Sequence, residues 1–468
     1  MTKNDTLRPM DRPQTIDPRD VIANSPMSRL QMVVIGITIA LNALDGFDIL
    51  SISFASPGIR KEWGIEPAAL GVVLSMELIG MAIGSIVLGG VSDTIGRRRT
   101  TLGCLVMMAF GMFMATTATS PVNLSVWRVI TGLGIGGMLA SMNAVASEFS
   151  SNRRRHLSVS LMSIGYPLGA VFGGMVAARL LRTNDWRSVF YFGSAVTATL
   201  IPIVFFVVPE SIHWLARKQP RGALEAINRA LARMHHAPVA ELPEIAADAR
   251  RRSVADIFAP SMVALTVIVT VAYFFHITTF YFVMKWVPTI VVDFGFPQSS
   301  GAGVLVWGNA GGATGGAIFG LLTLRFGLKP LTIAVMVLST VAVMLFGQSP
   351  ADLQRLSMIC FACGFFTNAA IVGMYAIIAQ AFPTHVRASG TGFAVGVGRG
   401  GSVLAPIIAG FLFEAGYKLP VVAAIMALGS LVAAGVLMLL KLESDRAVAA
   451  REERVVAPTR IPAPRGAS

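Results

Sequence analysis

Long stretches of apolar residues recur along the chain, and they restrict its fold more than any other feature. Each is about the ~20 residues that a helix needs to cross a bilayer. In a soluble protein such stretches would all have to be buried in cores, yet only 13% of the residues are charged, against roughly 25% in ordinary soluble domains. We therefore predict an all-α integral membrane protein with twelve transmembrane helices in two six-helix halves.

The predicted spans divide the chain into five parts. These are an N-terminal tail (1–31), a first half (32–208), a polar central loop (209–259), a second half (260–441) and a charged, Pro-rich C-terminal tail (442–468). The individual spans are predicted at 32–58, 67–90, 100–119, 123–147, 157–181, 188–208, 261–291, 300–324, 331–348, 353–381, 388–413 and 420–441.

The net charge of +13 is distributed unevenly. Most Lys and Arg fall in loops on one side of the predicted bundle, together with the central loop and both tails; they include Arg97, Arg98, Arg99, Arg153, Arg154, Arg155, Arg217, Lys218, Arg325, Lys329 and Arg387. Because cytoplasmic loops carry an excess of Lys and Arg, we expect a multi-pass protein of the inner (plasma) membrane with both termini in the cytoplasm. The surplus then meets anionic lipid, and we expect no nucleic-acid partner.

The two halves repeat weakly in sequence. Residues 149–155 (Phe-Ser-Ser-Asn-Arg-Arg-Arg) precede the fifth span, and residues 382–387 (Phe-Pro-Thr-His-Val-Arg) precede the eleventh. An offset of 233 positions relates them and also superposes Gly165 on Gly398. Internal repeats of this kind are typical of transporters whose binding site lies between the halves.

The loop between the second and third spans carries the most specific short motif, Gly89-Gly-Val-Ser-Asp93-Thr-Ile-Gly96-Arg97. We interpret Gly89 as a point of close helix approach, Asp93 as a carboxylate that stabilises a helix N-terminus, and Gly96 as the turn. Arg97 and its neighbours would meet carboxylates or lipid head groups. Together they predict a gating clasp; the alternative is a basic loop with no gating role.

This loop resembles the signature motif of the major facilitator superfamily. The RxxxGxG pattern that begins at Arg128 and the Pro-Glu-Ser-Ile-His-Trp-Leu of residues 209–215 resemble two further motifs of that superfamily. The resemblance covers residues 32–441 and implies a twelve-helix secondary transporter. Thr94 departs from the pattern, because a basic residue usually follows the aspartate.

The first span contains two aspartates, in Asp45-Gly-Phe47-Asp48. Their i,i+3 spacing puts both on one face of the helix, at a depth where ionised carboxylates are costly and usually functional. We interpret Asp45 and Asp48 as proton carriers; the alternative is a structural pair satisfied by neighbouring helices. The segment is similar to the Asp-Gly-Phe/Tyr-Asp of the aromatic acid:proton symporter family, and this resemblance implies that symport depends on the two aspartates.

Four further charged residues are candidates for substrate binding or gating. Arg399 lies among glycines inside the eleventh span, which we expect to leave room for a guanidinium and a ligand carboxylate. Arg128, near the periplasmic end of the fourth span, would either counter an aspartate of the first span or bind the anion. Arg387 and Glu148 are gating candidates at cytoplasmic span ends, where a loop anchor and a surface salt bridge are the alternatives.

Four other residues inside the predicted spans are further candidates. Glu77 is interpreted as a second proton carrier or as a partner of Lys285, and Lys285 as a residue that extends its amine to the interface. His276 could titrate near neutrality and contact substrate, with a structural hydrogen-bonded histidine as the alternative. Phe47 could stack on a planar ring, although aromatic residues also serve as membrane packing.

From these features we expect a secondary active transporter rather than an enzyme. The leading function is proton-coupled uptake of an aromatic carboxylate of the benzoate, hydroxybenzoate or phenylpropionate type by alternating access. The alternatives are transport of another organic anion and export of a metabolite. We expect no cofactor beyond the proton gradient and no metal, with the aromatic anion, the proton and the lipid bilayer as partners of a monomer.

Overall fold

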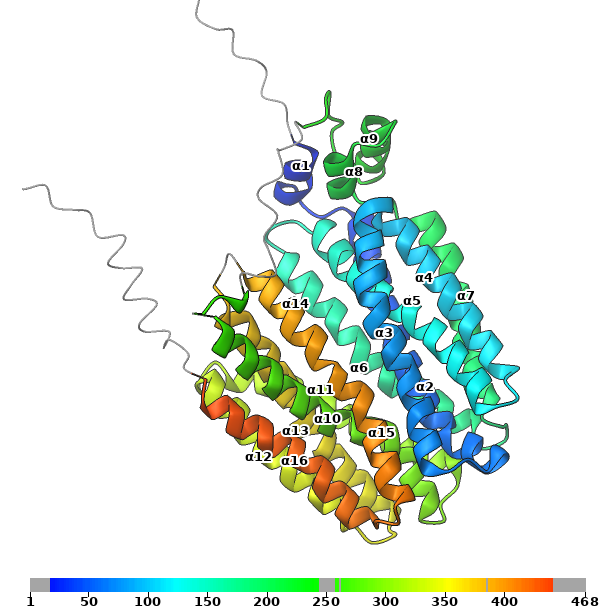
Figure 1. The fold of residues 1–468 in the computed structure, drawn as a ribbon. Coiled ribbons are helices and arrows are strands. Elements are labelled where there is room, and N and C mark those ends of the chain that lie inside the picture. Colours follow the sequence, from blue (N-terminus) through cyan, green and yellow to red (C-terminus); the bar gives the residue numbers. More distant parts are fainter. Residues whose placement is uncertain (1–16, 244–256, 261, 384–385, 441–468) are drawn as a thin grey trace, which may run out of the picture.

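The computed structural model describes residues 17–243, 257–260, 262–383 and 386–440. This part of the chain is helical, with no β-strand among its elements (Figure 1). The first half comprises α2 (Arg29–Trp63), α3 (Pro67–Ile95), α4 (Arg97–Thr116), α5 (Pro121–Glu148), α6 (Arg155–Leu180) and α7 (Arg187–Val207). The second comprises α10 (Val263–Asp293), α11 (Gln298–Leu322), α12 (Leu328–Gly347), α13 (Leu353–Ala381), α14 (Arg387–Gly398), α15 (Gly400–Glu414) and α16 (Leu419–Met438).

Local sequence signals set many of these helix ends. Ser28 caps α2 through a capping box with Gln31, in which each side chain bonds the other residue's backbone N–H. At the other end of α2, Gly64 adopts the left-handed conformation (φ 60°) that ends a helix. The prolines Pro67 and Pro121 stand at the first positions of α3 and α5, where a missing N–H costs nothing.

The predicted spans match observed helices, with ends that differ by a few residues. Eleven helical segments of the described chain are long and apolar enough to cross a membrane, α14 and α15 counting as one. The glycine-rich α11 is not among these eleven, because Gly, Ser and Asn lower its hydropathy; with it the count is twelve. The fold class predicted from the sequence is thus confirmed.

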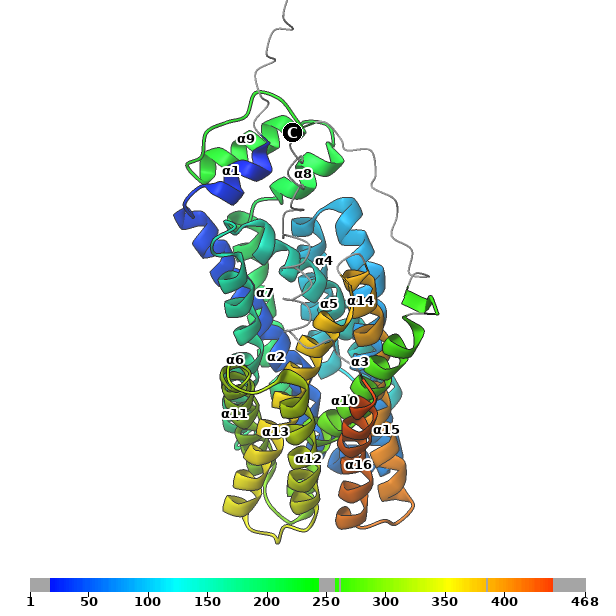
Figure 2. The ribbon, with the colours of Figure 1, turned by 90° about the vertical axis from the view of Figure 1, so that its left-hand side faces the viewer.

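Three short helices that the sequence did not predict lie together at one end of the bundle (Figures 1 and 2). They are α1 (Pro18–Asn24), α8 (Ile212–Lys218) and α9 (Ala223–Arg233). We call this end of the molecule the cap end, and the opposite end, where residues 64–66 join α2 to α3, the far end. Ile227 and Leu231 of α9 are one helical turn apart and both are buried, as expected of a helix with one apolar face.

The two halves meet around an axis of approximate two-fold symmetry. The hydroxyls of Ser56 on α2 and Thr289 on α10 lie 2.9 Å apart, and the two residues are 233 positions apart in sequence. One turn further out, Arg60 and Asp293 form an ion pair of 2.9 Å with the same separation. Equivalent positions of two repeats touch each other only near a symmetry axis, so these contacts confirm the offset derived from the sequence.

The hydrogen bonds and ion pairs between the halves lie at the far end and at the centre of the bundle. The Glu414 carboxylate of α15 accepts a hydrogen bond of 3.0 Å from the backbone N–H of Ala68, and the Val403 carbonyl accepts one of 2.7 Å from the hydroxyl of Ser75. Within the described residues, no hydrogen bond or ion pair joins the halves at the cap end. The structure is therefore in a state with the far end closed.

Candidate functional site

Three buried carboxylates lie on the inner helices of the first half. Asp45 and Asp48 project from α2 and Glu77 from α3, and each is at most 2% exposed. Neither aspartate has a hydrogen-bond partner for its carboxylate among the described residues, and both lie within electrostatic range of Glu77. Gly46, between the aspartates, is required by packing, because a Cβ atom there would collide with the backbone carbonyl of Tyr166 on α6.

Two buried cations meet at Glu77. Arg128 of α5 forms an ion pair with one oxygen of the Glu77 carboxylate, and Lys285 of α10 places its amine 3.7 Å from the other. Arg128 also donates a 3.1 Å hydrogen bond to the backbone carbonyl of Asp48, and Lys285 donates one to that of Ile49. Arg128 thus pairs with Glu77 and not with an aspartate side chain.

The position of Lys285 corrects one expectation from the sequence. We expected its amine to extend to the membrane interface, but the side chain is fully buried and joins the second half to the first. Of the two interpretations of Glu77, the structure favours the partner of Lys285, because both of its oxygens already face cations.

Arg399 has a different environment in the second half. It occupies the one-residue interruption between α14 and α15, although its backbone stays near helical values (φ −58°, ψ −18°). Among the described residues no carboxylate pairs with it; its electrostatic partners are the phenol groups of Tyr166, Tyr273, Tyr281 and Tyr375. These are four of the six tyrosines in the chain. A half-buried guanidinium that has no carboxylate partner among the described residues is suited to an added anion.

The glycines around Arg399 serve a purpose other than the expected one. A Cβ atom at Gly398 would collide with the ring of Tyr273, and one at Gly401 with the backbone of Phe274. These glycines therefore let the helix carrying Arg399 pack closely on α10, and only Gly396 has open space beside it. Tyr375, one of the tyrosines near the guanidinium, is 42% exposed.

Sequence reasoning missed Tyr166 as a site residue. Tyr166 is an electrostatic partner both of the acids Asp45 and Glu77 and of Tyr281, as well as of Arg399. It therefore lies between the acidic group and the free guanidinium. The repeat contained the signal: the offset of 233 that superposes Gly165 on Gly398 also relates Tyr166 to Arg399, and Asp48 to Tyr281.

Two candidates for substrate contact lie within single halves. Both ring nitrogens of His276 are engaged, with the Ser430 hydroxyl and the Thr367 carbonyl each at 2.9 Å. Phe47 packs edge-on against Phe192, with ring centroids 5.3 Å apart, and is 4% exposed. In this conformation neither side chain reaches the space between the halves, and both have the contacts of structural residues.

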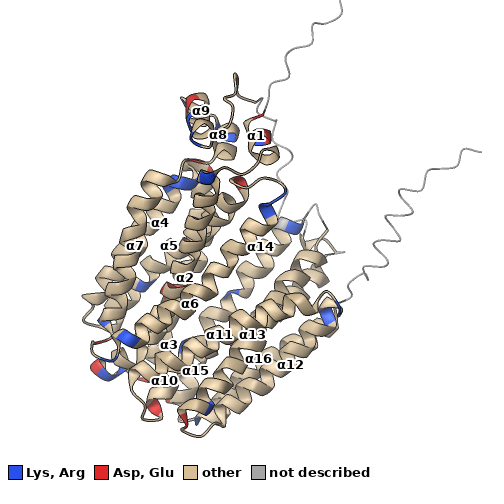
Figure 3. Cartoon of the chain, turned by 180° about the vertical axis from the view of Figure 1, so that it is seen from behind, with Lys and Arg blue, Asp and Glu red and all other residues tan. Residues whose placement is uncertain are grey.

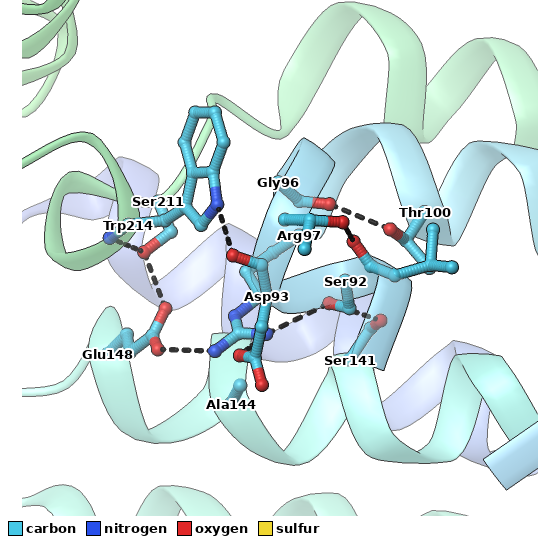
Figure 4. A network of polar contacts seen from close by, with 12 residues as sticks. Ser92, Asp93, Gly96, Arg97, Thr100, Ser141, Ala144, Glu148, Ser211 and Trp214 are labelled. Atoms are coloured by element: carbon cyan, nitrogen blue, oxygen red, sulfur yellow. Dashed lines mark hydrogen bonds and ion pairs between the residues drawn. The ribbon is translucent and has the colours of Figure 1, made fainter. Parts of the chain in front are cut away.

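The motif of residues 89–97 forms a polar cluster with α5 and α8 (Figure 4). Arg97 pairs with Asp93 at 2.7 Å and with Glu148 at 3.6 Å. Glu148 also accepts a hydrogen bond of 2.5 Å from the hydroxyl of Ser211, and the indole of Trp214 donates one of 3.1 Å to the Asp93 carbonyl. The cluster thus ties the α3–α4 turn to the short helix α8.

Of the other residues in the predicted gate, Gly96 behaves as expected, whereas Gly89 and Arg387 do not. Gly96 makes the turn as expected, with φ 110°, but a Cβ atom at Gly89 would meet Ala140 at 3.5 Å, an ordinary contact that does not require glycine. Arg387 begins α14 instead of ending the tenth span, and bonds the Phe382 carbonyl at 3.2 Å. No described residue of the second half pairs with the cluster in this conformation.

Several transporters are similar to this chain over most of its length. The chain is 26% identical over 427 residues to a gallate transporter of Pseudomonas putida, covering 91% of this chain and 95% of that protein. It is 28% identical to a 4-hydroxybenzoate transporter of the same species (84% and 88% covered). It is 29% identical to a 3-(3-hydroxy-phenyl)propionate transporter of Escherichia coli strain K12 (88% and 94%).

A solved transporter structure and a family profile also match this chain over most of its length. The inward open structure of the xylose transporter XylE from E. coli superposes with a TM-score of 0.67 at 18% identity, covering 91% of this chain and 99% of that one. The sequence profile of the Major Facilitator Superfamily matches residues 38–351 and 269–465. The chain therefore belongs to the major facilitator superfamily.

Proposed function

We propose that this protein imports aromatic carboxylates together with protons by alternating access. The observation that carries the proposal is Arg399, a guanidinium set among tyrosines between the halves with no acidic partner among the described residues. The named relatives support the substrate class, because gallate, 4-hydroxybenzoate and hydroxyphenylpropionate all combine a carboxylate with a hydroxylated ring.

The residues around Arg399 suit both parts of such a ligand, the carboxylate and the aromatic ring. A guanidinium binds a carboxylate through two parallel hydrogen bonds, so the substrate carboxylate is assigned to Arg399. The aromatic ring then lies against Tyr273 and Tyr375, whose rings are 5.7 Å apart and whose hydroxyls are 3.1 Å apart. Phenol hydroxyls both donate and accept hydrogen bonds, which favours hydroxylated rings.

Proton coupling is assigned to Asp45 and Asp48. A buried carboxylate without a hydrogen-bond partner is costly while it is ionised, and binding a proton removes that cost. When the far end opens, the two aspartates would meet external water and take up a proton, and they would release it on the other side. Glu77 is assigned a different role, because Arg128 and Lys285 already balance its charge.

The orientation of the protein in the membrane, and with it the direction of uptake, is inferred from the charges at the two ends (Figure 3). Clusters of Lys and Arg mark the cap end, whereas two of the basic residues of the far end pair with acids, Arg60 with Asp293 and Arg187 with Glu62. By the positive-inside rule, the cap end is cytoplasmic and the far end faces outward. Uptake driven by the proton gradient then runs from the far end to the cap end.

The proposal is tested by uptake of a labelled hydroxybenzoate into proteoliposomes with an imposed pH gradient. We expect accumulation that a protonophore abolishes. Asp45→Asn and Asp48→Asn should each reduce accumulation at least about tenfold, because net transport needs a titrating carboxylate. Counterflow, in which labelled substrate exchanges for unlabelled substrate, should persist because it moves no net proton.

Asp20→Asn is the matched control, since Asp20 is an exposed aspartate of α1, and it should leave both assays unchanged. Accumulation that survives both Asp45→Asn and the protonophore would rule out the coupling. If a gradient of the opposite sign drives substrate out more efficiently than in, the protein is an exporter. Absence of counterflow with every aromatic acid would rule out the substrate class.

A further inference from the structure

The contacts between α10 and α2 form a graded series along one face of α10. Lys285, Thr289 and Asp293 stand at i, i+4 and i+8, so they share that face. They contact, in order from the centre to the far end, the Ile49 carbonyl, the Ser56 hydroxyl and the Arg60 guanidinium. We call these three contacts the innermost, middle and outermost steps of the series. They differ in chemistry, and this difference determines how each contact responds when the halves separate.

The outermost step, the ion pair between Arg60 and Asp293, contributes little to holding the far end closed. The side chains of Arg60 and Asp293 are 31% and 56% exposed, and exposed ion pairs are screened by water and salt. The middle step is a hydrogen bond between two hydroxyls, Ser56 and Thr289. Neither step leaves an uncompensated charge when it breaks.

The innermost step differs, because it places a whole charge in a dry interior. Lys285 is fully buried, and its two partners among the described residues, the Ile49 carbonyl and the Glu77 carboxylate, both belong to the other half. Separating the halves at the far end would deprive Lys285 of both. Glu77 would keep Arg128, which belongs to its own half. A buried charge that loses its partner is strongly unfavourable.

We propose that the Lys285–Glu77 ion pair is the latch that holds the far end of the transporter closed. Lys285 acts as a positioning residue: it sets the balance between the closed and open far end without contacting substrate. The latch opens only when water reaches the centre and replaces the lost partners. The inference rests on the proposed function only in assuming that the far end opens and closes.

The test measures the far end directly, in the full chain and without substrate or a pH gradient. Spin labels at Lys61→Cys and Arg355→Cys, exposed positions on opposite halves, report the separation by double electron–electron resonance. The three native cysteines are buried and should remain unlabelled. We expect mostly short distances in the parent protein and an at least threefold larger share of long distances in Lys285→Met.

Three further variants separate the latch from other effects. Lys285→Arg keeps the charge and should retain the parent distribution. Lys285→Gln keeps a donor for the Ile49 carbonyl but loses the charge, and should behave like Lys285→Met. Arg60→Gln removes the exposed pair of the same helix face and should leave the distribution unchanged.

The proposal is overturned if Lys285→Met and Lys285→Gln both keep the parent distances, or if Arg60→Gln shifts them equally. A Lys285→Gln protein that matches the parent would assign closure to the hydrogen bond and also overturn the ion-pair latch. If Lys285→Met does not fold, Glu77→Gln provides the same measurement, with a rise in long distances expected. A failure of aromatic acid uptake would leave these distances untouched, so the two proposals fail separately.

Discussion

At the scale of single residues, the buried charges of the two halves are balanced in different ways. Glu77 has two cations and Arg128 has an acid, whereas the electrostatic partners of Arg399 among the described residues are phenol groups. The carboxylates of Asp45 and Asp48 have no hydrogen-bond partner in the part of the chain that the structure describes. A proton or a substrate anion could complete such residues, which is why the proposed function assigns them to proton coupling and substrate binding.

The geometry at Arg399 predicts that its shape matters as well as its charge. Lysine keeps the charge but lacks the planar fork that binds a carboxylate with two hydrogen bonds. Arg399→Lys should therefore raise the KM for aromatic acid uptake about tenfold, the equivalent of about 1.4 kcal/mol. The measurement is the concentration dependence of initial uptake rates.

Arg355→Lys, at an exposed position of the far end, is the control for Arg399→Lys and should leave the KM unchanged. An Arg399→Lys protein with the parent KM would show that a point charge is enough. In that case Arg399 does not bind the substrate carboxylate through two hydrogen bonds, and the assignment of the carboxylate to Arg399 would be wrong.

At the scale of elements, the cap end depends on one turn. Gly96 joins α3 to α4 with φ 110°, and its Cα faces the Glu210 carboxylate. That carboxylate accepts hydrogen bonds of 3.1 Å from the backbone N–H of Arg98 and of 3.0 Å from that of Ser211. A single glycine thus lets the chain before α8 dock onto the start of α4.

Alanine at Gly96 would have to adopt a backbone conformation that side chains disfavour, and its Cβ would collide with Glu210. Gly96→Ala should therefore destabilise the protein by about 1–3 kcal/mol. The measurement is thermal unfolding of the purified protein in detergent. Gly103→Ala, in the next helix with open space around the glycine, should be neutral or mildly stabilising; equal destabilisation by both would contradict the argument.

At the scale of the whole molecule, two halves related by approximate symmetry are closed at one end. Small residues make this closure tight: a Cβ atom at Gly71 would collide with the Pro406 carbonyl, and one at Gly410 would lie 2.5 Å from that of Pro67. Both contacts cross between α3 and α15. The closed state therefore requires glycine at these positions, whereas an open far end does not.

Gly71→Ala should accordingly bias the protein toward an open far end. The colliding atoms belong to backbone, which cannot move aside cheaply, so the closed state alone is penalised. We expect a severalfold larger share of long distances between labels at Lys61→Cys and Arg355→Cys. Gly303→Ala, in α11 with no neighbour near its Cα, should leave the distances as they are, and a Gly71→Ala protein with the parent distances would contradict the expectation.

The sequence by itself determined the membrane class, the span positions, the two-fold repeat and which charged residues lie inside the membrane. Those follow from hydropathy and local motifs, because a charge among apolar residues is rare enough to be noticed. Only the tertiary structure decided that Glu77 joins Arg128 to Lys285, that Arg399 has no acidic partner among the described residues, and that His276 is satisfied within one half. These pairings join residues far apart in the chain, so they depend on how helices pack, which no local pattern encodes.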